Sequence, residues 1–300
     1  DQYVEYIEEA QKMDPDIASE FRYRNPPITE KDLCIVISQS GETADSIWAV
    51  RTAKEKGARV IGIVNVKDST IAALSDSVIY TKAGAEIAVA TTKAYSAQLS
   101  VMYCIAVHLA AALDKISTDE KEMYISELLS LPSLIEKTVS ENLDAMKTLS
   151  GFFAGKEHAY FIGRGTDYAV ALEGSLKLKE ISYIHSEAYG AGELKHGTIS
   201  LIERGTAVVA LMCDEGVMTK TVSNAKEVKA RHAKVIAVTN KRNKDKASEF
   251  DFTILIPDCS ELISPSLEVI PLQLLSYFTA KSKGCDIDKP RNLAKSVTVE

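Results

Sequence analysis

The chain has 300 residues, of which 46% are hydrophobic and 26% charged, and its formal net charge is −7. This length allows two compact α/β domains or one large one, and the composition is that of a soluble globular protein. The negative charge gives no electrostatic reason to expect nucleic acid or an anionic membrane as a partner. We also find no apolar run long enough to span a bilayer, so we expect a cytoplasmic protein.

Five cysteines are scattered along the chain, and no two of them have the C-x-x-C spacing of redox or zinc sites. Cys34 and Cys104 lie inside apolar runs. Widely spaced cysteines in odd number favour reduced, buried thiols over disulfides. No cluster of histidine, cysteine and carboxylate residues has metal-ligand spacing, so we expect no metal site.

Short β-branched runs alternate with longer helical patterns, which is typical of parallel sheets covered by helices on both faces. In the first half of the chain, residues 33–38 and 58–65 predict buried strands, and residues 75–81 lead into a third. Helices are predicted over residues 43–57 and from about 92 to 113. We therefore expect an α/β fold with a parallel sheet.

The second half of the chain repeats this plan. Ala58 and Asp76 correspond to Ala233 and Asp251 with a constant offset of 175 positions, which indicates an internal duplication. A charged segment from about residue 114 to residue 150, helical in pattern and with a proline near its middle, is expected to bridge the copies. The elements predicted in the second copy are strands over 206–212, 233–240 and 250–257 and a helix over 218–230.

The duplication also indicates that the first copy is incomplete. The second copy opens with a strand and a helix, over residues 159–184, which the first copy lacks. His185-Ser-Glu187 follows that helix and resembles Ala18-Ser-Glu20. The residues before Ala18 can supply a helix but not a strand, a turn and a helix. We expect either a truncation at the N-terminus or a missing stretch near Met13 to Asp16.

The segment Ser38-Gln-Ser-Gly-Glu-Thr43 follows a buried strand and opens a helix. Ligands bind at this place in parallel α/β units, because free N–H groups and the helix dipole favour an anion. Three hydroxyl groups surround one glycine, which lets the backbone approach phosphate oxygens closely. No G-K-[ST] follows, so the segment is not a nucleotide-binding P-loop. A polar turn with Thr43 as helix N-cap is the alternative interpretation.

Four other groups of residues are candidates for chemistry. Val89-Ala-Thr-Thr-Lys93 precedes a long helix and is either a ligand loop or a helix cap. Glu173, Lys177 and Glu180 share one helix face, which is either a solvated salt-bridge face or a carboxylate base beside a stabilising cation. His196 lies in a glycine-rich segment, and Lys295 lies in the C-terminal tail; spacing alone assigns neither a role.

Taken together, these segments resemble the isomerase region of the glucosamine-6-phosphate synthase family, which is built from two sugar isomerase (SIS) domains. The resemblance runs in family order from Ile17 to the last residue. It implies two duplicated SIS domains, each a parallel sheet with helices on both faces, over residues 1–150 and 151–285, followed by a tail over 286–300. The matching stretches are IASEFRYR, SQSGETAD, AGAEIAVATTKAYSAQL, ALEGSLKLKEISYIHSEAYGAGELKHG, PLQLLSY and PRNLAKSVTVE.

The resemblance also implies a role for each matched residue. Glu180 would shuttle the proton between C1 and C2, and Lys177 would stabilise the intermediate. His196 would assist ring opening, from the neighbouring subunit of a homodimer, and Lys295 would meet the ketose carbonyl. The residues implied to bind fructose 6-phosphate are Ser38, Gln39, Ser40 and Thr43 at the phosphate and Val89, Thr91 and Ala294 at the sugar.

The product implied is glucosamine 6-phosphate, formed without metal or organic cofactor. Two features of the family are not found in this sequence. The glutaminase domain, expected upstream in a full-length protein, is absent. So is the Cys-Gly-Thr-Ser turn that ends the family's first strand. A SIS module that binds a sugar phosphate without converting it is therefore the alternative function, and deamination in the reverse direction would use the same residues.

Overall fold

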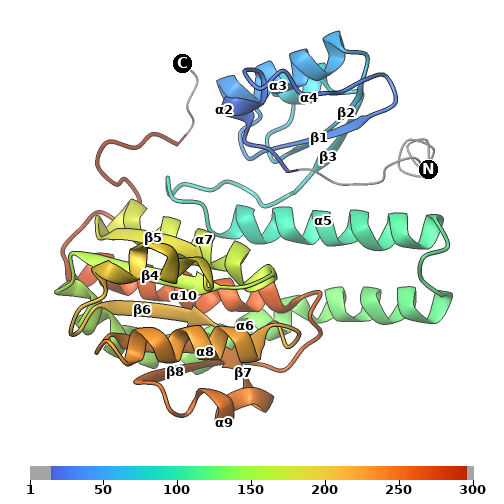
Figure 1. Ribbon diagram of the computed structural model, residues 1–300. Coiled ribbons are helices and arrows are strands. Elements are labelled where there is room, and N and C mark those ends of the chain that lie inside the picture. The colour runs from blue at the N-terminus through green and yellow to red at the C-terminus, as the bar shows by residue number, and fades with distance from the viewer. Residues whose placement is uncertain (1–14, 296–300) are drawn as a thin grey trace. The chain divides into compact units, whose positions relative to one another are not determined.

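The computed structural model describes residues 15–295, and the chain divides into two compact units (Figure 1). Unit 1 is made of residues 1–125 and 293–300, and unit 2 of residues 126–292. Both units contain a parallel sheet flanked by helices, which confirms the predicted α/β class. The domain boundaries at residues 150 and 285 stay predictions.

Unit 1 has a three-stranded parallel sheet in the order β1-β2-β3. Side chains alternate between its two faces, because successive residues of a strand point to opposite sides. On one face Val60 and Val64 pack with Val50 and Ala53 of α3 and Ile71 of α4 to form the core of this unit. The elements are α2 (Ala18–Phe21), β1 (Leu33–Ser38), α3 (Ala44–Glu55), β2 (Arg59–Val64), α4 (Thr70–Leu74), β3 (Ser77–Tyr80) and α5 (Lys93–Ala112).

Unit 2 has a five-stranded parallel sheet in the order β5-β4-β6-β7-β8. The helix α6 (Thr118–Ala154) leads into it as one continuous helix with Pro132 inside, at the place where a bridging helix was predicted. The strands are β4 (His158–Gly163), β5 (His185–Gly190), β6 (Ala207–Leu211), β7 (Lys234–Asn240) and β8 (Phe252–Ile256). The remaining helices are α7 (Thr166–Ser182), α8 (Met218–Lys229), α9 (Lys244–Ala247), α10 (Ser264–Ser282) and the 3-10 turns η1 (Glu193–His196), η2 (Thr198–Leu201) and η3 (Lys241–Asn243).

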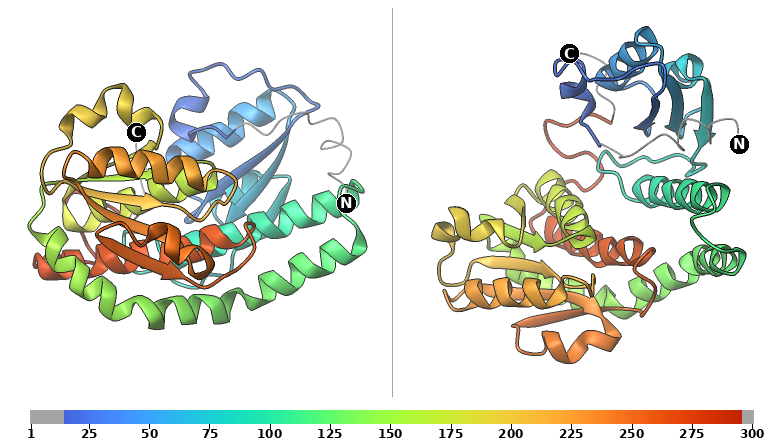
Figure 2. Two further views of the ribbon diagram at one scale, coloured as in Figure 1. Left: turned by 60° about the horizontal axis from the view of Figure 1, so that its bottom comes forward. Right: turned by 45° about the vertical axis from the view of Figure 1, so that its right-hand side comes forward.

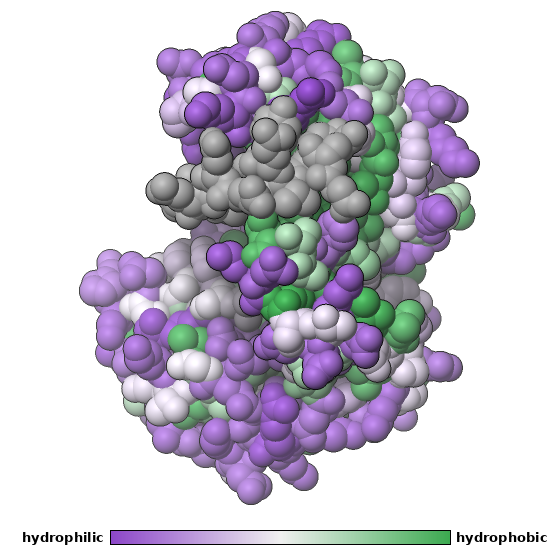
Figure 3. Space-filling model, turned by 90° about the vertical axis from the view of Figure 1, so that its right-hand side faces the viewer, coloured by the Kyte–Doolittle hydropathy of each residue, from purple (hydrophilic) through white to green (hydrophobic). Residues whose placement is uncertain are grey.

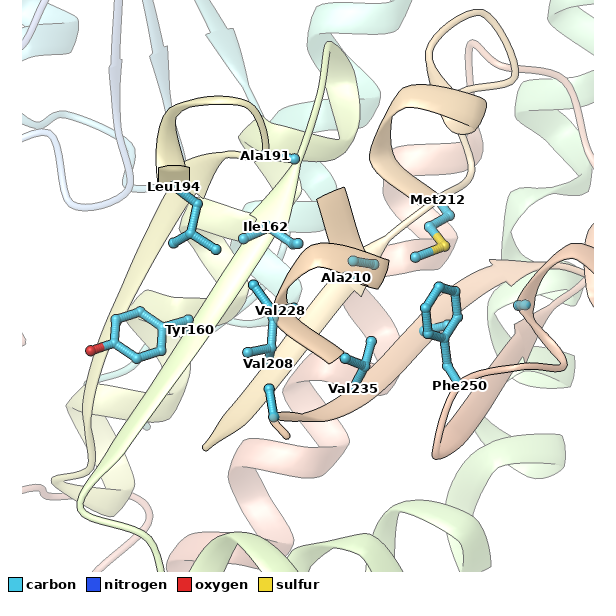
Figure 4. Close-up of a cluster of buried hydrophobic side chains, with 14 of the residues drawn as sticks. Tyr160, Ile162, Ala191, Leu194, Val208, Ala210, Met212, Val228, Val235 and Phe250 are labelled. Carbon is cyan, nitrogen blue, oxygen red and sulfur yellow. The ribbon is translucent and has the colours of Figure 1, made fainter. Parts of the chain in front are cut away.

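Both faces of the sheet in unit 2 are covered, as Figure 2 shows. On one face Ile162 and Val208 of β4 and β6 pack against Val228 of α8, within the cluster drawn in Figure 4. On the other face α7 fits closely between β4 and α10. A Cβ at Gly174 of α7 would lie 2.5 Å from Leu272 of α10 and 3.2 Å from Phe161 of β4. The strands read as continuous apolar runs because both of their faces are buried.

The internal duplication is confirmed by matching contacts in the two sheets. In unit 1 the Asp76 carboxylate accepts the Val60 amide at 2.8 Å, and in unit 2 the Asp251 carboxylate accepts the Val235 amide at 3.0 Å. Each of these two aspartates also pairs with a lysine at 2.8 and 2.7 Å. Strands β1, β2 and β3 thus correspond to β6, β7 and β8 in the same order.

The two copies differ at the segment expected to match between them. His185–Gly190 forms the strand β5, whereas Ala18–Phe21 forms the short helix α2. In unit 2, β5 pairs only with β4. Within residues 15–295, no strand pairs with the outer edge of β1, so residues 18–20 have no ladder to join. The expected truncation at the N-terminus, and most of the alternative missing stretch near Met13 to Asp16, fall on or next to residues 1–14, which lie outside the described residues.

Helix α5 contradicts the expectation that no apolar run of the chain is long enough to span a bilayer. With 20 residues and few charges, it is the one helix of the described residues that is long and apolar enough to cross a membrane on length and composition. The statement that no apolar run reaches this length is therefore wrong. Core helices meet the same criterion, and the duplication makes α5 the counterpart of α10, which is a core helix.

The cysteines are only in part the buried thiols that the sequence favours. Cys213 is buried, and Cys34, Cys259 and Cys285 are half-buried. Cys104, in the middle of α5, is exposed, which contradicts the expectation for that residue. An apolar run predicts burial only where another element covers it, and the described part of unit 1 leaves this face of α5 open.

Candidate functional site

The turn after β1 is built from its own hydroxyl groups. Ser38, at the buried end of β1, has its Oγ 3.1 Å from the Thr43 Oγ1 and accepts the Gly41 amide at 3.1 Å. The Ser40 Oγ accepts the Glu42 amide, also at 3.1 Å. Thr43 is the N-cap residue of α3, but its side chain makes no capping hydrogen bond. The first amides of α3 therefore stay available to an anion at the helix N-terminus.

Gly41 is required by the shape of this turn. Its φ of 70° lies in the left-handed region, where a side chain is strained. A Cβ at this position would also overlap the Ser69 hydroxyl and lie 2.6 Å from the Ser69 Cβ. The turn after β1 is thus pressed against the start of α4, and only glycine fits there.

The C-terminal tail contacts the loop that follows β3. Lys295 donates from Nζ to the Ala88 carbonyl at 2.6 Å, and its Nζ lies 3.5 Å from a carboxylate oxygen of Glu86. The other oxygen of Glu86 accepts the Thr92 amide at 2.7 Å, next to the start of α5. Val89 and Thr91 on this loop are half-buried, while Ala294 is exposed. The tail is therefore docked in unit 1 as far as residue 295, and residues 296–300 lie outside the described part.

In unit 2, α7 carries a buried charged group. Lys177 is 4% exposed, and its Nζ lies 2.6 Å from Glu180 and 3.5 Å from Glu173. These are the i, i+3 and i, i+4 spacings of one helix face. Solvated surface ion pairs contribute little, but a lysine that is nearly buried with two carboxylates is held in one geometry. The interpretation as a solvated salt-bridge face is thus wrong.

Burial perturbs the proton affinity of one member of this group. It raises the pKa of Glu173 from 4.5 to about 7, with Lys177 lowering and Glu180 raising it to smaller extents. The Glu173 carboxyl is therefore protonated in a large fraction of molecules near neutral pH. Of the two carboxyl groups beside Lys177, that of Glu180 lies at the shorter distance.

His196 ends the 3-10 turn η1 and is exposed, so the segment expected as a loop is partly ordered. The turn is anchored by Leu194, which is buried in the core of unit 2 (Figure 4). The candidate residues thus fall into two sets. Unit 1 carries the hydroxyl turn and the loop with Lys295, and unit 2 carries the charged face of α7 and His196.

Comparison with known protein families shows to which family the chain belongs. The SIS domain model matches residues 13–108 and 152–280, most of unit 1 and the sheet of unit 2. This chain belongs to the SIS domain family. The two matches confirm that the internal duplication is a pair of SIS domains, as the resemblance implied.

The relatives identify the branch of the SIS family. The glutamine–fructose-6-phosphate aminotransferase (isomerizing) of Clostridium tetani is 56% identical over 95% of this chain and 47% of its own length. The solved C-terminal domain of glucosamine-fructose-6-phosphate aminotransferase from Francisella tularensis is 38% identical, with a TM-score of 0.88 over 92% of this chain and 77% of that one. This SIS protein is therefore homologous to the isomerase domain of these aminotransferases, and it spans about half the length of the curated relatives it matches.

A second solved relative is named for a different activity. Glucosamine-6-phosphate deaminase from Thermotoga maritima is 27% identical, with a TM-score of 0.71 over 93% of this chain and 80% of that one. The double SIS architecture of the chain is therefore shared with proteins that carry more than one activity.

Glu42 supports the hydroxyl turn, and the sequence did not single it out within its motif. Its two carboxylate oxygens accept the Thr70 amide at 2.8 Å and the Thr70 hydroxyl at 2.7 Å, at the start of α4. These hydrogen bonds, the amide first, lower the pKa of Glu42 below its usual value. Glu42 thus fastens the turn to α4. A capping role of this kind is invisible in the sequence because the two residues are 28 positions apart.

A buried acidic pair at the start of α7 was also missed. Asp167 and Glu268 are both fully buried, and with Cys213 they bring three possible metal ligands within 4.8 Å of one another. Asp167 already accepts the amides of Cys213 and Asp214 at 3.0 and 3.1 Å. Burial raises the pKa of Asp167 to about 6 and that of Glu268 well above its usual value, so Glu268 holds the proton between them. The pair fixes α7 to the loop after β6.

Proposed function

We propose that this protein binds fructose 6-phosphate and converts it with ammonia to glucosamine 6-phosphate by ketose–aldose isomerisation. The observation that carries the proposal is the buried Glu173–Lys177–Glu180 group on α7, in a chain homologous to aminotransferase isomerase domains. We further propose that it acts in the cytoplasm as a homodimer, with a glutaminase domain upstream in the full-length protein as the ammonia source.

The phosphate group is assigned to the turn after β1. Ser38, Ser40 and Thr43 offer hydroxyl donors, and the first amides of α3 point out of the same turn. A dianion at a helix N-terminus is favoured by both the free amides and the helix dipole. Gln39, Val89, Thr91 and Ala294 complete the proposed set of substrate contacts.

Glu180 is the proposed base. Ammonia adds to the C2 carbonyl and water leaves, which gives an imine at C2. Glu180 then removes a proton from C1 and delivers a proton to C2, while the C1 hydroxyl proton moves to the imine nitrogen, which leaves an aldehyde at C1 and an amine at C2. The proton held on Glu180 can exchange with water before it is delivered. Lys177, 2.6 Å from Glu180, would stabilise the negative charge that develops on oxygen during this shift.

Lys295 and His196 have the remaining proposed roles. Lys295 would meet the open-chain carbonyl, and its contacts with Ala88 and Glu86 support this by holding the amine at the loop that bears Val89 and Thr91. His196 is exposed at the end of η1 and would assist ring opening of the sugar. A neutral imidazole can pass a proton in either direction near neutral pH.

The test follows proton exchange at the sugar. In deuterated water, the protein with fructose 6-phosphate should incorporate deuterium at C1, measured by proton NMR, and should form glucosamine 6-phosphate when ammonium is added. Glu180→Gln should lower exchange by about 10²-fold or more, the usual contribution of a general base. Glu136→Gln, an exposed carboxylate on α6, is the matched control. Exchange that is equal in the wild-type protein and Glu180→Gln would overturn the proposal.

Two alternative functions predict different results. The deaminase relative favours the reverse direction, in which glucosamine 6-phosphate would release ammonium as fructose 6-phosphate forms. A sensor module would instead bind fructose 6-phosphate in a calorimetric titration without any deuterium exchange.

A further inference from the structure

Two histidines meet across neighbouring strands of unit 2. His158 opens β4 and His185 opens β5, and the two are direct partners in the parallel register of these strands. Their Nδ1 atoms lie 3.2 Å apart, and the ring planes cross at 81°. Both side chains are exposed, so ions from solution can reach the pair. Because the residues are 27 positions apart, their spacing in the sequence does not reveal them as a pair of ligands.

The contact between the rings fixes where their protons lie. Two neutral imidazoles form a hydrogen bond only when one Nδ1 carries a proton and the other offers a lone pair. Glu187 lies two residues beyond His185, on the same side of β5, and its Oε1 is 3.9 Å from the His185 Nε2. This carboxylate attracts the His185 proton to Nε2. The His185 Nδ1 is thus the acceptor of the pair, and the His158 Nδ1 is the donor.

The separation of the two nitrogens also suits a shared metal ion. Divalent transition metals bind imidazole nitrogen at about 2.0–2.1 Å, so two nitrogens on one ion lie about 2.9 Å apart at a right angle and about 3.4 Å apart in tetrahedral geometry. The observed 3.2 Å falls inside this range. Since both rings are exposed, a small rotation of each aims both Nδ1 atoms at one point. His158 only has to move its proton from Nδ1 to Nε2, which changes its tautomer and not its charge.

Glu187 supplies the outer contact that metal-binding histidines usually have. Such a histidine donates its second N–H to a carboxylate, which orients the ring and makes the ligating nitrogen more basic. The Glu187 carboxylate is itself held in place, because its other oxygen accepts the Tyr189 hydroxyl at 2.5 Å. Two imidazoles favour Zn²⁺, Ni²⁺ or Cu²⁺ over Mg²⁺ or Ca²⁺, which prefer oxygen ligands.

We propose that His158 and His185 bind one divalent transition-metal ion of the Zn²⁺, Ni²⁺ or Cu²⁺ class through their Nδ1 atoms. Glu187 orients His185, and water fills the other positions of the ion. The site lies where β4 and β5 begin, whereas substrates of parallel α/β sheets bind at the carboxyl ends of the strands. Gly163 ends β4 five residues after His158, about 16 Å away. The ion therefore joins the edge strand β5 to β4 and takes no part in the sugar chemistry.

Titration with nickel chloride tests the site in the full, untagged chain. Calorimetry should show one tight site per chain. His158→Asn and His185→Asn should each weaken binding by about a hundredfold or more, since a second linked ligand raises the affinity by at least that factor. Glu187→Gln should weaken it by about tenfold, the usual effect of losing an outer carboxylate. His232→Asn, at an exposed histidine of the same unit, is the matched control and should leave the affinity unchanged.

A spectrum of the wild-type protein identifies the ligands even if a variant is unstable. With less than one equivalent of copper chloride, electron paramagnetic resonance should show two nitrogen donors on the copper ion. Equal Ni²⁺ affinity in the wild-type protein and in both histidine variants would overturn the proposal. So would a copper spectrum with sulfur ligands or with fewer than two nitrogens, since the ion would then lie elsewhere, for example at the exposed Cys104 thiol.

Discussion

Replacing Gly41 by alanine tests the geometry of the hydroxyl turn. The φ of 70° costs a residue with a side chain about 1–2 kcal/mol. The overlap of the new Cβ with Ser69 adds about 1–3 kcal/mol, the usual cost of overpacking. We therefore expect Gly41→Ala to lower the free energy of unfolding of unit 1 by about 2–5 kcal/mol in total.

The assay can isolate unit 1, because Trp48 is the only tryptophan of the chain and lies on α3, the helix that the turn opens. Urea unfolding followed by tryptophan fluorescence therefore reports this unit. Adding Ser69→Gly to Gly41→Ala removes the overlap and should leave only the backbone cost of about 1–2 kcal/mol. Adding Ser69→Ala should rescue less, because its Cβ stays 2.6 Å from the new methyl group.

Two results would refute this reasoning. The first is a loss below about 1 kcal/mol for Gly41→Ala, which would mean that the turn relaxes without cost. The second is equal rescue by Ser69→Ala and Ser69→Gly, which would place the clash at the hydroxyl alone. If the turn also binds phosphate, Gly41→Ala should weaken calorimetric binding of fructose 6-phosphate, and Ser69→Gly should not restore it fully.

Three further predictions concern charged side chains. Because the pKa of Glu173 is raised to about 7, its contribution to stability is fully present below pH 4.5 and is lost as the pH rises through 7; Glu173→Gln should flatten this decline in urea titrations followed by circular dichroism. Lys177→Met should cost about 3–5 kcal/mol in the same assay, and much less when Glu173 and Glu180 are both glutamine, because only the single variant leaves buried carboxylates unpaired. Asp76→Ala and Asp251→Ala should each cost about 1–3 kcal/mol by leaving a strand amide unpaired, and only the former should shift the tryptophan unfolding curve.

The features that could be predicted from the sequence are those that depend on local patterns and on the internal repeat. Periodicity predicts the strands and helices and their order in both copies. The constant offset predicts that Asp76 and Asp251 occupy equivalent positions. Contacts between distant residues could not be predicted in this way. Asp167 and Glu268 form a buried acidic pair although they are 101 positions apart, and neither stands out as a single residue.

The exposure of Cys104 and the helical state of residues 18–21 were missed for a different reason. Both depend on whether a neighbouring element is present. An apolar helix face is buried only when something covers it, and an extended segment becomes a strand only when a partner strand offers hydrogen bonds. A pattern of residues indicates whether a segment favours burial or strand pairing. Whether another part of the chain provides the covering surface or the partner strand cannot be read from that pattern.

The duplication explains why a phosphate site is expected in one copy only. The offset of 175 places Ser38, Gln39 and Ser40 opposite Cys213, Asp214 and Glu215. The second turn therefore carries carboxylates where the first carries a serine hydroxyl and a glutamine amide, and these repel an anion. In addition, the backbone amides of Cys213 and Asp214 already donate hydrogen bonds to the Asp167 carboxylate of α7, so they are not available to an anion.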